Sequence, residues 1–241
     1  HLEGSFYYPR LGFGSIFDRI GEYIGSENIH LNSSVQIINH EKNKVKSVVL
    51  ENGDIIKVEN LISTMPINIL AKSLDPQPPN EILTFLESIR FRTIKLCILY
   101  LSIDQFTENA SIYFPDIGCP FNRIYEPKNR SKAMAPKDKT CIVVEVPCEK
   151  DDLLYNCDDD QFLEIIIVSL LKNNLIDKNN IIDSISLKVP YAYPILNQSS
   201  IPNLEKITSF VKTYTNLCNI GRSAQFQYLH THDLFLQAKQ K

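Results

Sequence analysis

Residues 31–66 read LNSSVQIINHEKNKVKSVVLENGDIIKVENLISTMP. Short apolar runs alternate here with polar residues, and β-strands have this pattern because successive side chains point to opposite faces of a sheet. Turn residues separate the runs at Glu41–Asn43 and at Asn52–Gly53, and Asn-Gly supplies the positive φ angles that a two-residue hairpin requires. The segment from Ile29 to Ser63 therefore predicts a compact strand meander.

A helix is predicted upstream of this meander. Ser15 precedes a stripe of apolar residues at helical spacing, which consists of Ile16, Phe17, Ile20, Tyr23 and Ile24. We expect Ser15 to cap the helix, because a side-chain oxygen can accept from the first free backbone N–H groups. Asp18, which we place in the first turn, would favour the positive end of the helix dipole.

The rest of the chain combines further strands and helices. The predicted strands are residues 93–103, 111–116, 140–146 and 186–196. We expect the second and third of these strands to lie beside the long strand at residues 93–103. The predicted helices are residues 80–88, a helix that begins after Asp158, and residues 202–217. Asp158 can cap its helix, with Gln161 in the reciprocal position. We therefore predict an α/β (mixed α+β) fold with mainly antiparallel strands.

Composition excludes several classes of protein. The chain has 241 residues, 44% of them hydrophobic, and a formal net charge of -3. Lys and Arg are scattered, which argues against a nucleic-acid-binding surface. No apolar run approaches the roughly 20 residues that span a bilayer, and no signal-peptide pattern opens the sequence. We therefore expect a cytoplasmic protein with no membrane span and no nucleic-acid partner.

Metal and disulfide chemistry are not indicated. The six cysteines lie far apart without a CxxC pair, so we expect structural thiols in a reducing compartment. His230 and His232 are separated by one residue, whereas two ligands on one helical face need a spacing of about four. No metal site is predicted.

The C-terminal stretch NIGRSAQFQYLHTHDLFLQ, from Asn219 to Gln237, allows two interpretations. In the first, it is a surface loop followed by a helix that docks through its Leu and Phe side chains. In the second, it brings a helix N-terminus, Arg222 and Tyr228 up to a phosphorylated ligand, because helix N-termini and arginines both bind anions.

Five small motifs occur in a particular order along the chain. They are FYYPRLGFGSIFDRI (residues 6–20), the meander that ends in STMP, FNRIYEPKN (121–129), VPYAYPIL (189–196) and IGRSAQFQYLHTHD (220–233). In this order the chain resembles the flavoprotein superfamily of amine oxidases, protoporphyrinogen oxidases and UDP-galactopyranose mutases. It is most similar to the FAD-dependent, protoporphyrinogen-oxidase-like proteins that accompany nucleotide-sugar pathways.

The resemblance covers only the latter part of such a flavoprotein. Its N-terminal GxGxxG unit, which binds the dinucleotide, has no counterpart in this sequence, and Gly12-Phe13-Gly14 lacks the third glycine. The resemblance implies an FAD-domain portion at residues 1–70, a substrate domain at 71–215 and a return to the FAD domain at 216–241. It also implies that the missing dinucleotide-binding unit is supplied in cis or in trans.

The resemblance implies FAD as the cofactor and a set of residues around it. Val35 would offer backbone groups to the adenine, and Thr64 and Pro66 would lie near the adenosine half. Gly221 would let the backbone approach the cofactor, and Arg222 would pair with phosphate or with the electron-rich edge of the flavin.

Three further positions follow from the same motif. Tyr228 would face the flavin or a substrate phosphate, and the helix starting near His230 to Asp233 would point its positive end at the flavin or diphosphate. The sequence departs from its relatives at Ala224, where Gly is common, and at His230 and His232, where acidic or amide residues are common. These departures place the redox partner and the substrate in question.

On the substrate side, the resemblance points to one arginine-and-tyrosine set: Tyr8, Arg10, Arg123, Tyr191 and Tyr193. Arginine with nearby tyrosines suits a small-molecule substrate such as a nucleotide sugar, whose diphosphate accepts charge-assisted hydrogen bonds. No general base or other catalytic residue is assigned, because the flavin carries the hard chemistry in this superfamily.

Several functions remain open at this point. The resemblance implies the C-terminal part of an FAD-dependent oxidoreductase. The alternatives are a flavin-dependent isomerase like UDP-galactopyranose mutase, or a non-catalytic binding module that has lost FAD. An unrelated α/β binding domain, in which the order of the motifs is a coincidence, is a further alternative.

Overall fold

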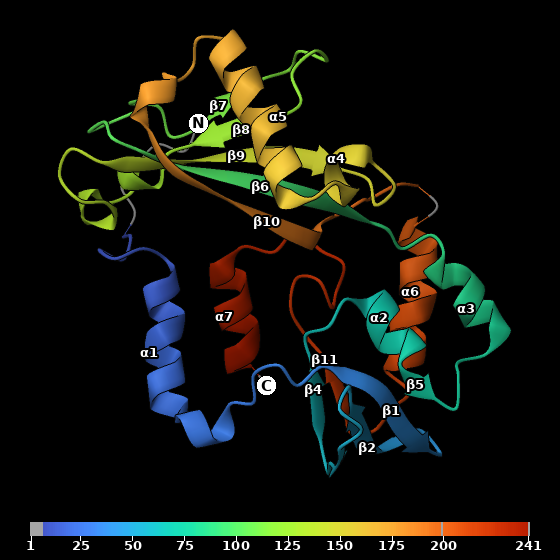
Figure 1. Ribbon diagram of the computed structural model, residues 1–241. Coiled ribbons are helices and arrows are strands. Elements are labelled where there is room, and N and C mark those ends of the chain that lie inside the picture. Colours follow the sequence, from blue (N-terminus) through green and yellow to red (C-terminus); the bar gives the residue numbers. More distant parts are fainter. Residues whose placement is uncertain (1–6, 199, 241) are drawn as a thin grey trace. The chain divides into compact units, whose positions relative to one another are not determined.

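The computed structural model describes residues 7–198 and 200–240. It has the predicted mixed α/β fold, with several sheets and mainly antiparallel pairing (Figure 1). The chain divides into two compact units, His1–Ile29 with Thr93–Pro190, and His30–Arg92 with Tyr191–Lys241. Compactness does not say which unit holds a cofactor, so the functional boundaries at residues 70 and 215 stay predictions.

The first unit is built on a five-stranded sheet with the order β10-β6-β9-β8-β7. Its strands are β6 (Phe91–Leu101), β7 (Ile112–Tyr113), β8 (Arg123–Tyr125), β9 (Thr140–Cys148) and β10 (Ile181–Pro194). The start of β6, residues 91–92, and the end of β10, residues 191–194, belong to the second unit. Strands β6 and β9 pair antiparallel from Thr93↔Cys148 to Leu101↔Thr140. The prediction that residues 140–146 flank the long strand is confirmed, whereas residues 111–116 do not flank it. Their strand, β7, pairs with β8 at the far edge of the sheet.

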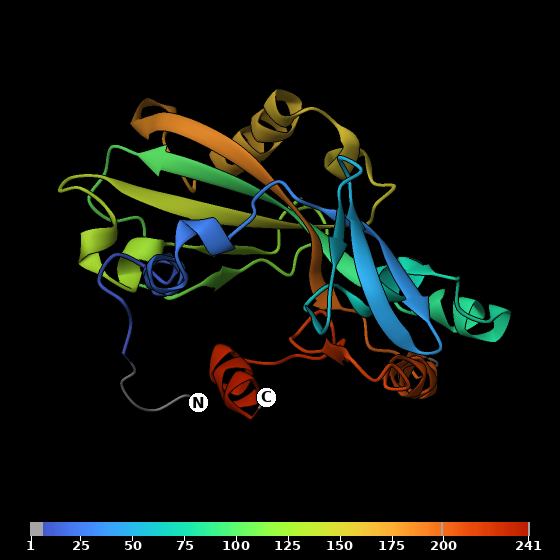
Figure 2. The same cartoon turned by 90° about the horizontal axis from the view of Figure 1, so that it is seen from below.

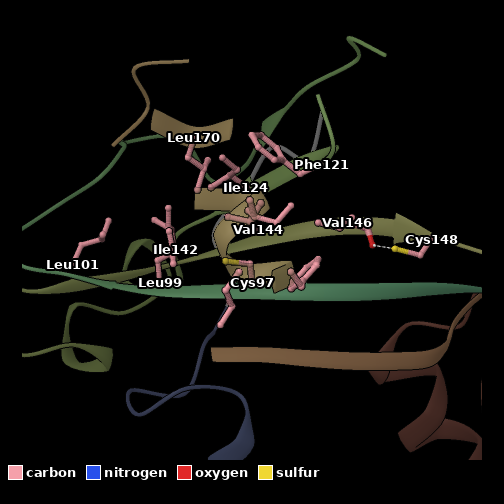
Figure 3. Close-up of a cluster of buried hydrophobic side chains, with 13 residues drawn as sticks. Cys97, Leu99, Leu101, Phe121, Ile124, Ile142, Val144, Val146, Cys148 and Leu170 are labelled. Carbon is pink, nitrogen blue, oxygen red and sulfur yellow. Dashed lines mark hydrogen bonds between the residues drawn. The ribbon is translucent and has the colours of Figure 1, made fainter. Parts of the chain in front are cut away.

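One face of this sheet carries the core of the unit. Helix α5 (Asp159–Lys172) covers it, after the single turn of α4 (Leu153–Asn156) (Figure 1). Alternate residues of β6 and β9 join side chains of the helix in one buried cluster, which Figure 3 shows. The predicted cap of α5 is confirmed, because the Asp158 carboxylate accepts from the backbone N–H of Gln161 at 2.8 Å.

A fully buried lysine lies beneath the start of α5. Lys95 donates through Nζ to the carbonyl of Cys157 at 3.0 Å and lies 3.3 Å from Oδ1 of Asp159. Its ammonium also lies 4.4 Å from the centroid of the Phe162 ring. Asp159 and these neighbours compensate for the removal of a charge from water, which is otherwise costly.

Helix α1 (Gly14–Ile24) forms where it is predicted, but its start differs from the prediction. Ser15 does not cap it, since Ser15 is already inside the helix and its hydroxyl donates to the carbonyl of Gly12 at 2.7 Å. Asp18 lies beyond the first turn, which contains no acidic residue. The helix buries none of its residues among those described, and Phe17 and Tyr23 are 55% and 93% exposed.

Short 3₁₀ helices connect the elements of this unit. They are η1 (Ser26–Asn28), η2 (Pro127–Asn129), η3 (Lys132–Met134) and η4 (Lys178–Asn180).

The second unit contains the meander. Strands β1 (Val35–Glu41), β2 (Lys44–Leu50) and β3 (Ile55–Lys57) form an antiparallel ribbon, and β5 (Leu74–Asp75) adds parallel to β1. Figure 2 shows β1 and β2 side by side. The two-residue hairpin turn lies at Lys42 and Asn43, both with positive φ. At Asn52–Gly53 the loop is longer and only Gly53 has positive φ, which corrects the prediction of a two-residue turn there.

The predicted meander is too long at both ends. Residues 29–31 form no strand, and β4 (Leu61–Ser63) leaves the meander to pair in parallel with β11 (Leu217–Asn219). The predicted helix at residues 202–217 is likewise shorter, because α6 (Ser200–Val211) ends before β11 begins. Parallel pairing needs partners far apart in the chain, so no local pattern around residues 61–63 could reveal it.

Two clusters of buried side chains hold the second unit together. One joins the meander to α6 and β11 through Ile38, Val45, Val211 and Leu217. The other surrounds Phe226 and includes residues of α2 (Ile67–Lys72) and α3 (Asn80–Leu86). The predicted helix at residues 80–88 is confirmed as α3, and the last helix is α7 (Thr231–Lys239). Among the described residues, we find no helix of the length and apolar character that crossing a membrane requires.

Candidate functional site

Arg222 lies over two tyrosine rings in the second unit. Its guanidinium carbon is 5.2 Å from the ring centroid of Tyr193 and 5.4 Å from that of Tyr228. The two rings stack on each other at 6.1 Å with an interplanar angle of 18°. We call Tyr193, Arg222 and Tyr228 the arginine–tyrosine cluster. Cation–π contacts of this kind hold a guanidinium in place while its N–H donors remain available.

The cluster is accessible to a ligand. Tyr228 is 54% exposed, and Tyr193 and Arg222 are partly buried. Among the described residues, no carboxylate pairs with the Arg222 guanidinium. The Tyr228 hydroxyl donates to the carbonyl of Pro194 at 2.9 Å, which fixes the ring without using the arginine. The cluster therefore presents a fixed positive charge that no carboxylate within residues 7–198 and 200–240 neutralises.

The position of Arg222 follows from the parallel ribbon β4–β11. The N–H of Ile220 donates to the carbonyl of Ser63 at 3.0 Å, so the chain leaves β11 next to the end of β4. Gly221 then adopts φ of 107°, where a side chain would be strained, and lies beside Thr64. The structure thus brings Thr64 and Gly221 together, and the contact predicted for each of them with a cofactor stays a prediction.

A tight turn fixes the residues that follow. The N–H of Gln225 donates to the carbonyl of Gly221 at 2.8 Å, and that of Gln227 donates to the carbonyl of Arg222 at 3.1 Å. Phe226 is buried, and its ring meets that of Phe91 edge-on at 5.0 Å. The buried ring therefore anchors the turn from below while Arg222 stays at the surface.

The start of α7 is capped by the side chain of Asp233, which lies in its first turn. The Asp233 carboxylate accepts from the backbone N–H of His230 at 2.9 Å. The His230 and His232 rings stack at 5.6 Å, and Nε2 of His232 lies 3.5 Å from Oδ1 of Asp233. Asp233 thus stabilises the helix start, and its predicted contact with a cofactor stays a prediction.

Val35 and Pro66, the other predicted cofactor residues, have clear local roles. Val35 opens β1, pairs with Leu50 beside a register shift, and is partly buried against the meander core. Pro66 precedes α2, whose first residue, Ile67, is buried. These roles are compatible with backbone contacts to a ligand but do not test them.

Arg123 of the first unit is held by a carboxylate. Its Nε donates to Oε2 of Glu145 at 2.9 Å, and its Nη2 donates to Oε1 of the same carboxylate. The guanidinium also lies 5.3 Å from the centroid of the Tyr125 ring. The sequence prediction missed Glu145, and no local pattern marks it, since it is one of several alternating residues in β9.

The remaining predicted substrate residues differ in their surroundings. Tyr8 is partly buried and Arg10 is exposed, and the Arg10 carbonyl accepts from the Ser131 hydroxyl at 2.7 Å. Tyr191 meets the Phe91 ring edge-on at 5.5 Å and packs against the Phe226 cluster, so it supports the core.

Cysteine nucleophiles are disfavoured at the buried positions of the first unit. Burial raises the pKa of the Cys97 thiol to about 12. Burial also raises the pKa of Cys141 and of Cys148. Since the thiolate is the reactive form, these residues act as small apolar side chains.

A family model described as flavin containing amine oxidoreductase matches residues 2–172. The search of curated proteins returned no match. Solved structures are similar, among them reduced UDP-galactopyranose mutase, with a TM-score of 0.77 and 21% identity over 92% of this chain and 48% of that one. At such identity the likeness shows a shared fold.

Two further structures cover the chain to a similar extent. A protein assigned as a protoporphyrinogen oxidase from Exiguobacterium sp. 255-15 has a TM-score of 0.72 and 14% identity over 92% of this chain and 49% of that one. Putrescine oxidase bound to putrescine has a TM-score of 0.58 and 14% identity over 89% of this chain and 49% of that one. The chain thus spans about half the length of these structures.

Proposed function

Because the chain belongs to the family of flavin-containing amine oxidoreductases, we propose that it forms the part of an FAD-dependent oxidoreductase that contacts the flavin and the substrate. Family membership confirms the resemblance drawn from the sequence motifs, and FAD is the cofactor that this family implies. The chain spans about half the length of its structural relatives, so the activity is proposed for the complete protein, with the dinucleotide-binding unit supplied in cis or in trans.

The arginine–tyrosine cluster is the observation that carries the proposal. Arg222 offers a guanidinium with no carboxylate partner among the described residues, which suits a phosphate or the electron-rich edge of a flavin. Gly221 allows close approach of the backbone because it has no side chain, and its φ of 107° favours glycine at this position. These residues fit the chemistry of a flavin dinucleotide.

Each residue has a separate task in this proposal. When bound, FAD supplies the electron-accepting chemistry that no side chain of the chain can provide. Arg222 binds and orients the anionic or electron-rich group, and the ring of Tyr228 excludes water on one side of it. Tyr193 holds the guanidinium through a second cation–π contact.

A nucleotide sugar is the substrate class that we propose. Its diphosphate suits the arginines predicted for the substrate side, Arg10 and Arg123, because charge-assisted hydrogen bonds orient phosphate oxygens. Arg10 is exposed, whereas Arg123 already pairs with Glu145. We therefore assign direct recognition of the diphosphate to Arg10, and to Arg123, held by Glu145, a role in shaping the substrate domain.

Isomerisation of a nucleotide sugar is the second candidate. The similarity to reduced UDP-galactopyranose mutase, with a TM-score of 0.77, supports it at the level of fold. The same cluster would serve either reaction, since both need an oriented flavin and a bound diphosphate. Product analysis separates them, because an isomerase leaves the substrate at its original oxidation level.

The two-stranded ribbon β4–β11 supports a missing dinucleotide-binding unit. Parallel sheets are normally larger and covered on both faces, yet among the described residues this one has two strands. Ile62 of β4 is 66% exposed, and its backbone groups face away from β11 because Leu61 and Ser63 make the bonds to that strand. We propose that strands of the missing unit continue the sheet along β4.

The proposal is tested by flavin absorbance. Spectra are recorded after addition of FAD to the purified chain and to the same chain extended upstream through its own reading frame. We expect a flavin band in the extended protein that is lost in Arg222→Ala and weakened in Arg222→Lys, which keeps the charge but not the fork. Lys72→Ala, an exposed change at the end of α2, serves as the control and should keep the band.

Two outcomes would contradict this assignment. A folded extended protein without a flavin band would indicate a binding module that does not use FAD. A flavin band that survives unchanged in Arg222→Ala would leave the family function in place but remove the cluster from it.

A further inference from the structure

A groove of about 650 Å³ runs beside β11 in the second unit. Its lining comes from three segments of the chain: residues 204–212 of α6 and its end, all of β11, and Gln225 with Gln227. A volume of this size lies within the range of roughly 300–1,000 Å³ typical of ligand sites. The proposed flavin chemistry uses none of these side chains.

All three residues of β11 line the groove, and one edge of this strand has no neighbouring strand among the described residues. On its other side β11 is joined to β4 by the carbonyl of Asn216, by Cys218 and by the N–H of Ile220. Backbone groups of alternate residues in a strand point to the same side, so those of Leu217 and Asn219 face away from β4. Within residues 7–198 and 200–240, β4 is the one strand that pairs with β11.

Two side-chain acceptors at the groove lack partners among the described residues. They are Oδ1 of Asn219 and Oε1 of Gln225, and both atoms are buried. The Asn219 amide is oriented by its other end, because Nδ2 donates to the carbonyl of Ala224 at 2.7 Å. Buried polar atoms are normally hydrogen-bonded, so each of these oxygens is an unused acceptor on a residue that lines the groove.

The wall formed by α6 is polar. Glu205, Thr208, Ser209 and Lys212 line the groove, and their spacing places them on one helical face. The wall therefore offers hydroxyl groups and both signs of charge. An entirely apolar ligand would leave all of these groups unpaired.

We propose that this groove binds an extended peptide segment, which adds as a third strand along β11. A peptide backbone alternates N–H and C=O groups at the spacing that Leu217 and Asn219 present, whereas a small ligand would match only part of that array. Additional peptide N–H groups suit the oxygens of Asn219 and Gln225, and charged peptide side chains suit Glu205 and Lys212. The proposal does not depend on FAD binding.

The test selects short peptides from a displayed random library on the immobilised chain and measures their affinity as free peptides. Ser209→Arg fills the groove from an exposed position of α6, and Ile201→Arg adds the same side chain to the same helix outside the groove. We expect Ser209→Arg to weaken binding roughly tenfold or more while Ile201→Arg leaves it unchanged. N-methylation of alternate peptide residues should weaken binding by a similar factor, because it removes the N–H donors of one edge.

Three results would overturn the proposal. One is the failure of any peptide to be enriched on the folded chain, and another is equal binding of the selected peptides to Ser209→Arg. The third is a dimer of the chain in light scattering that Ser209→Arg dissociates, since the occupant of the edge would then be a second copy.

Discussion

The side-chain amide of Asn216 hydrogen-bonds both backbone groups of Val45. Its Oδ1 accepts from the Val45 N–H at 2.8 Å, and its Nδ2 donates to the Val45 carbonyl at 2.9 Å and to the Glu59 carbonyl at 2.7 Å. At Val45 the amide takes the hydrogen-bonding place of a neighbouring strand. It thereby joins the meander to the residue before β11. These hydrogen bonds hold in place the start of the segment that carries Gly221 and Arg222.

Replacement of Asn216 by Ala is expected to lower the free energy of unfolding by about 2–3 kcal/mol, because it leaves backbone groups of the buried Val45 without partners. Chemical denaturation measures the change. Asn203→Ala is the control. Among the described residues its side chain makes one hydrogen bond, to the Ser88 hydroxyl at 3.1 Å, so the variant should cost about 1 kcal/mol or less. Equal costs for the two variants would show that the Asn216 amide does not join the segments in solution.

Gly221→Ala is expected to destabilise the chain by about 1–3 kcal/mol through backbone strain, since φ is 107° there. Steric clash is not the cause, because an added Cβ would lie 3.9 Å from Thr64. Gly14→Ala, at a helical position with open space around it, should be neutral or stabilising by up to about 1 kcal/mol. Thermal unfolding of both variants checks the pair, and a neutral Gly221→Ala would contradict the strained conformation.

Arg123→Ala is expected to cost about 2–3 kcal/mol of unfolding free energy, because Glu145 is then left as a largely buried carboxylate without its arginine. Adding Glu145→Gln to this variant should recover part of the loss. The control is Arg19→Ala, whose pair with Glu22 is exposed and should contribute no more than about 0.5 kcal/mol. If the two changes altered the unfolding free energy by purely additive amounts, Arg123 and Glu145 would not stabilise each other.

Asp159→Asn is expected to lower the melting temperature at neutral pH more than Asp160→Asn, its neighbour in the first turn of α5. The nearby Ser186 side chain and the Lys95 ammonium, whose Nζ lies 3.3 Å from Oδ1, hold the pKa of the Asp159 carboxyl below its usual range. A depressed carboxyl pKa contributes stability above the pKa of the unfolded chain and loses it as pH falls through the folded value.

The difference in melting temperature between the two Asp variants should therefore shrink as the pH is lowered below the pKa of an ordinary carboxyl group. Both variants remove one charge near the same helix end, so the helix dipole cancels in the comparison. Melting curves across acidic and neutral pH check this, and a constant difference would show that Asp159 does not compensate the buried Lys95. Because Asp159 is exposed, the effect should also weaken with salt.

Local patterns in the sequence were sufficient for several elements. The cap of α5 by Asp158 was predicted because capping depends on a few neighbouring residues, and it is confirmed. Ser15 was wrongly expected to cap α1, since the helix begins one residue before it. The hairpin turn lies at Lys42 and Asn43 although Asn52–Gly53 carries the stronger turn signal, because the pairing of β1 with β2 sets the register.

Long-range contacts were beyond local patterns. The pairing of β4 with β11, the bidentate partner Glu145 of Arg123, and the meeting of Tyr193 with Arg222 all join residues far apart in the chain. Sequence motifs assigned Tyr193 to the substrate and Arg222 to the cofactor. The folded chain places the two side chains in one cluster.

The sequence by itself determined the family, the mixed α/β class and FAD as the implied cofactor, because these depend on the order of motifs and on the period of apolar residues. Only the tertiary structure decided which charges are neutralised within the protein and which strand edges remain open. Arg123 pairs with Glu145, whereas Arg222 lies over two aromatic rings. The physical reason is that charges and strands pair through space. The partners can lie far apart in the sequence, where no local pattern marks them.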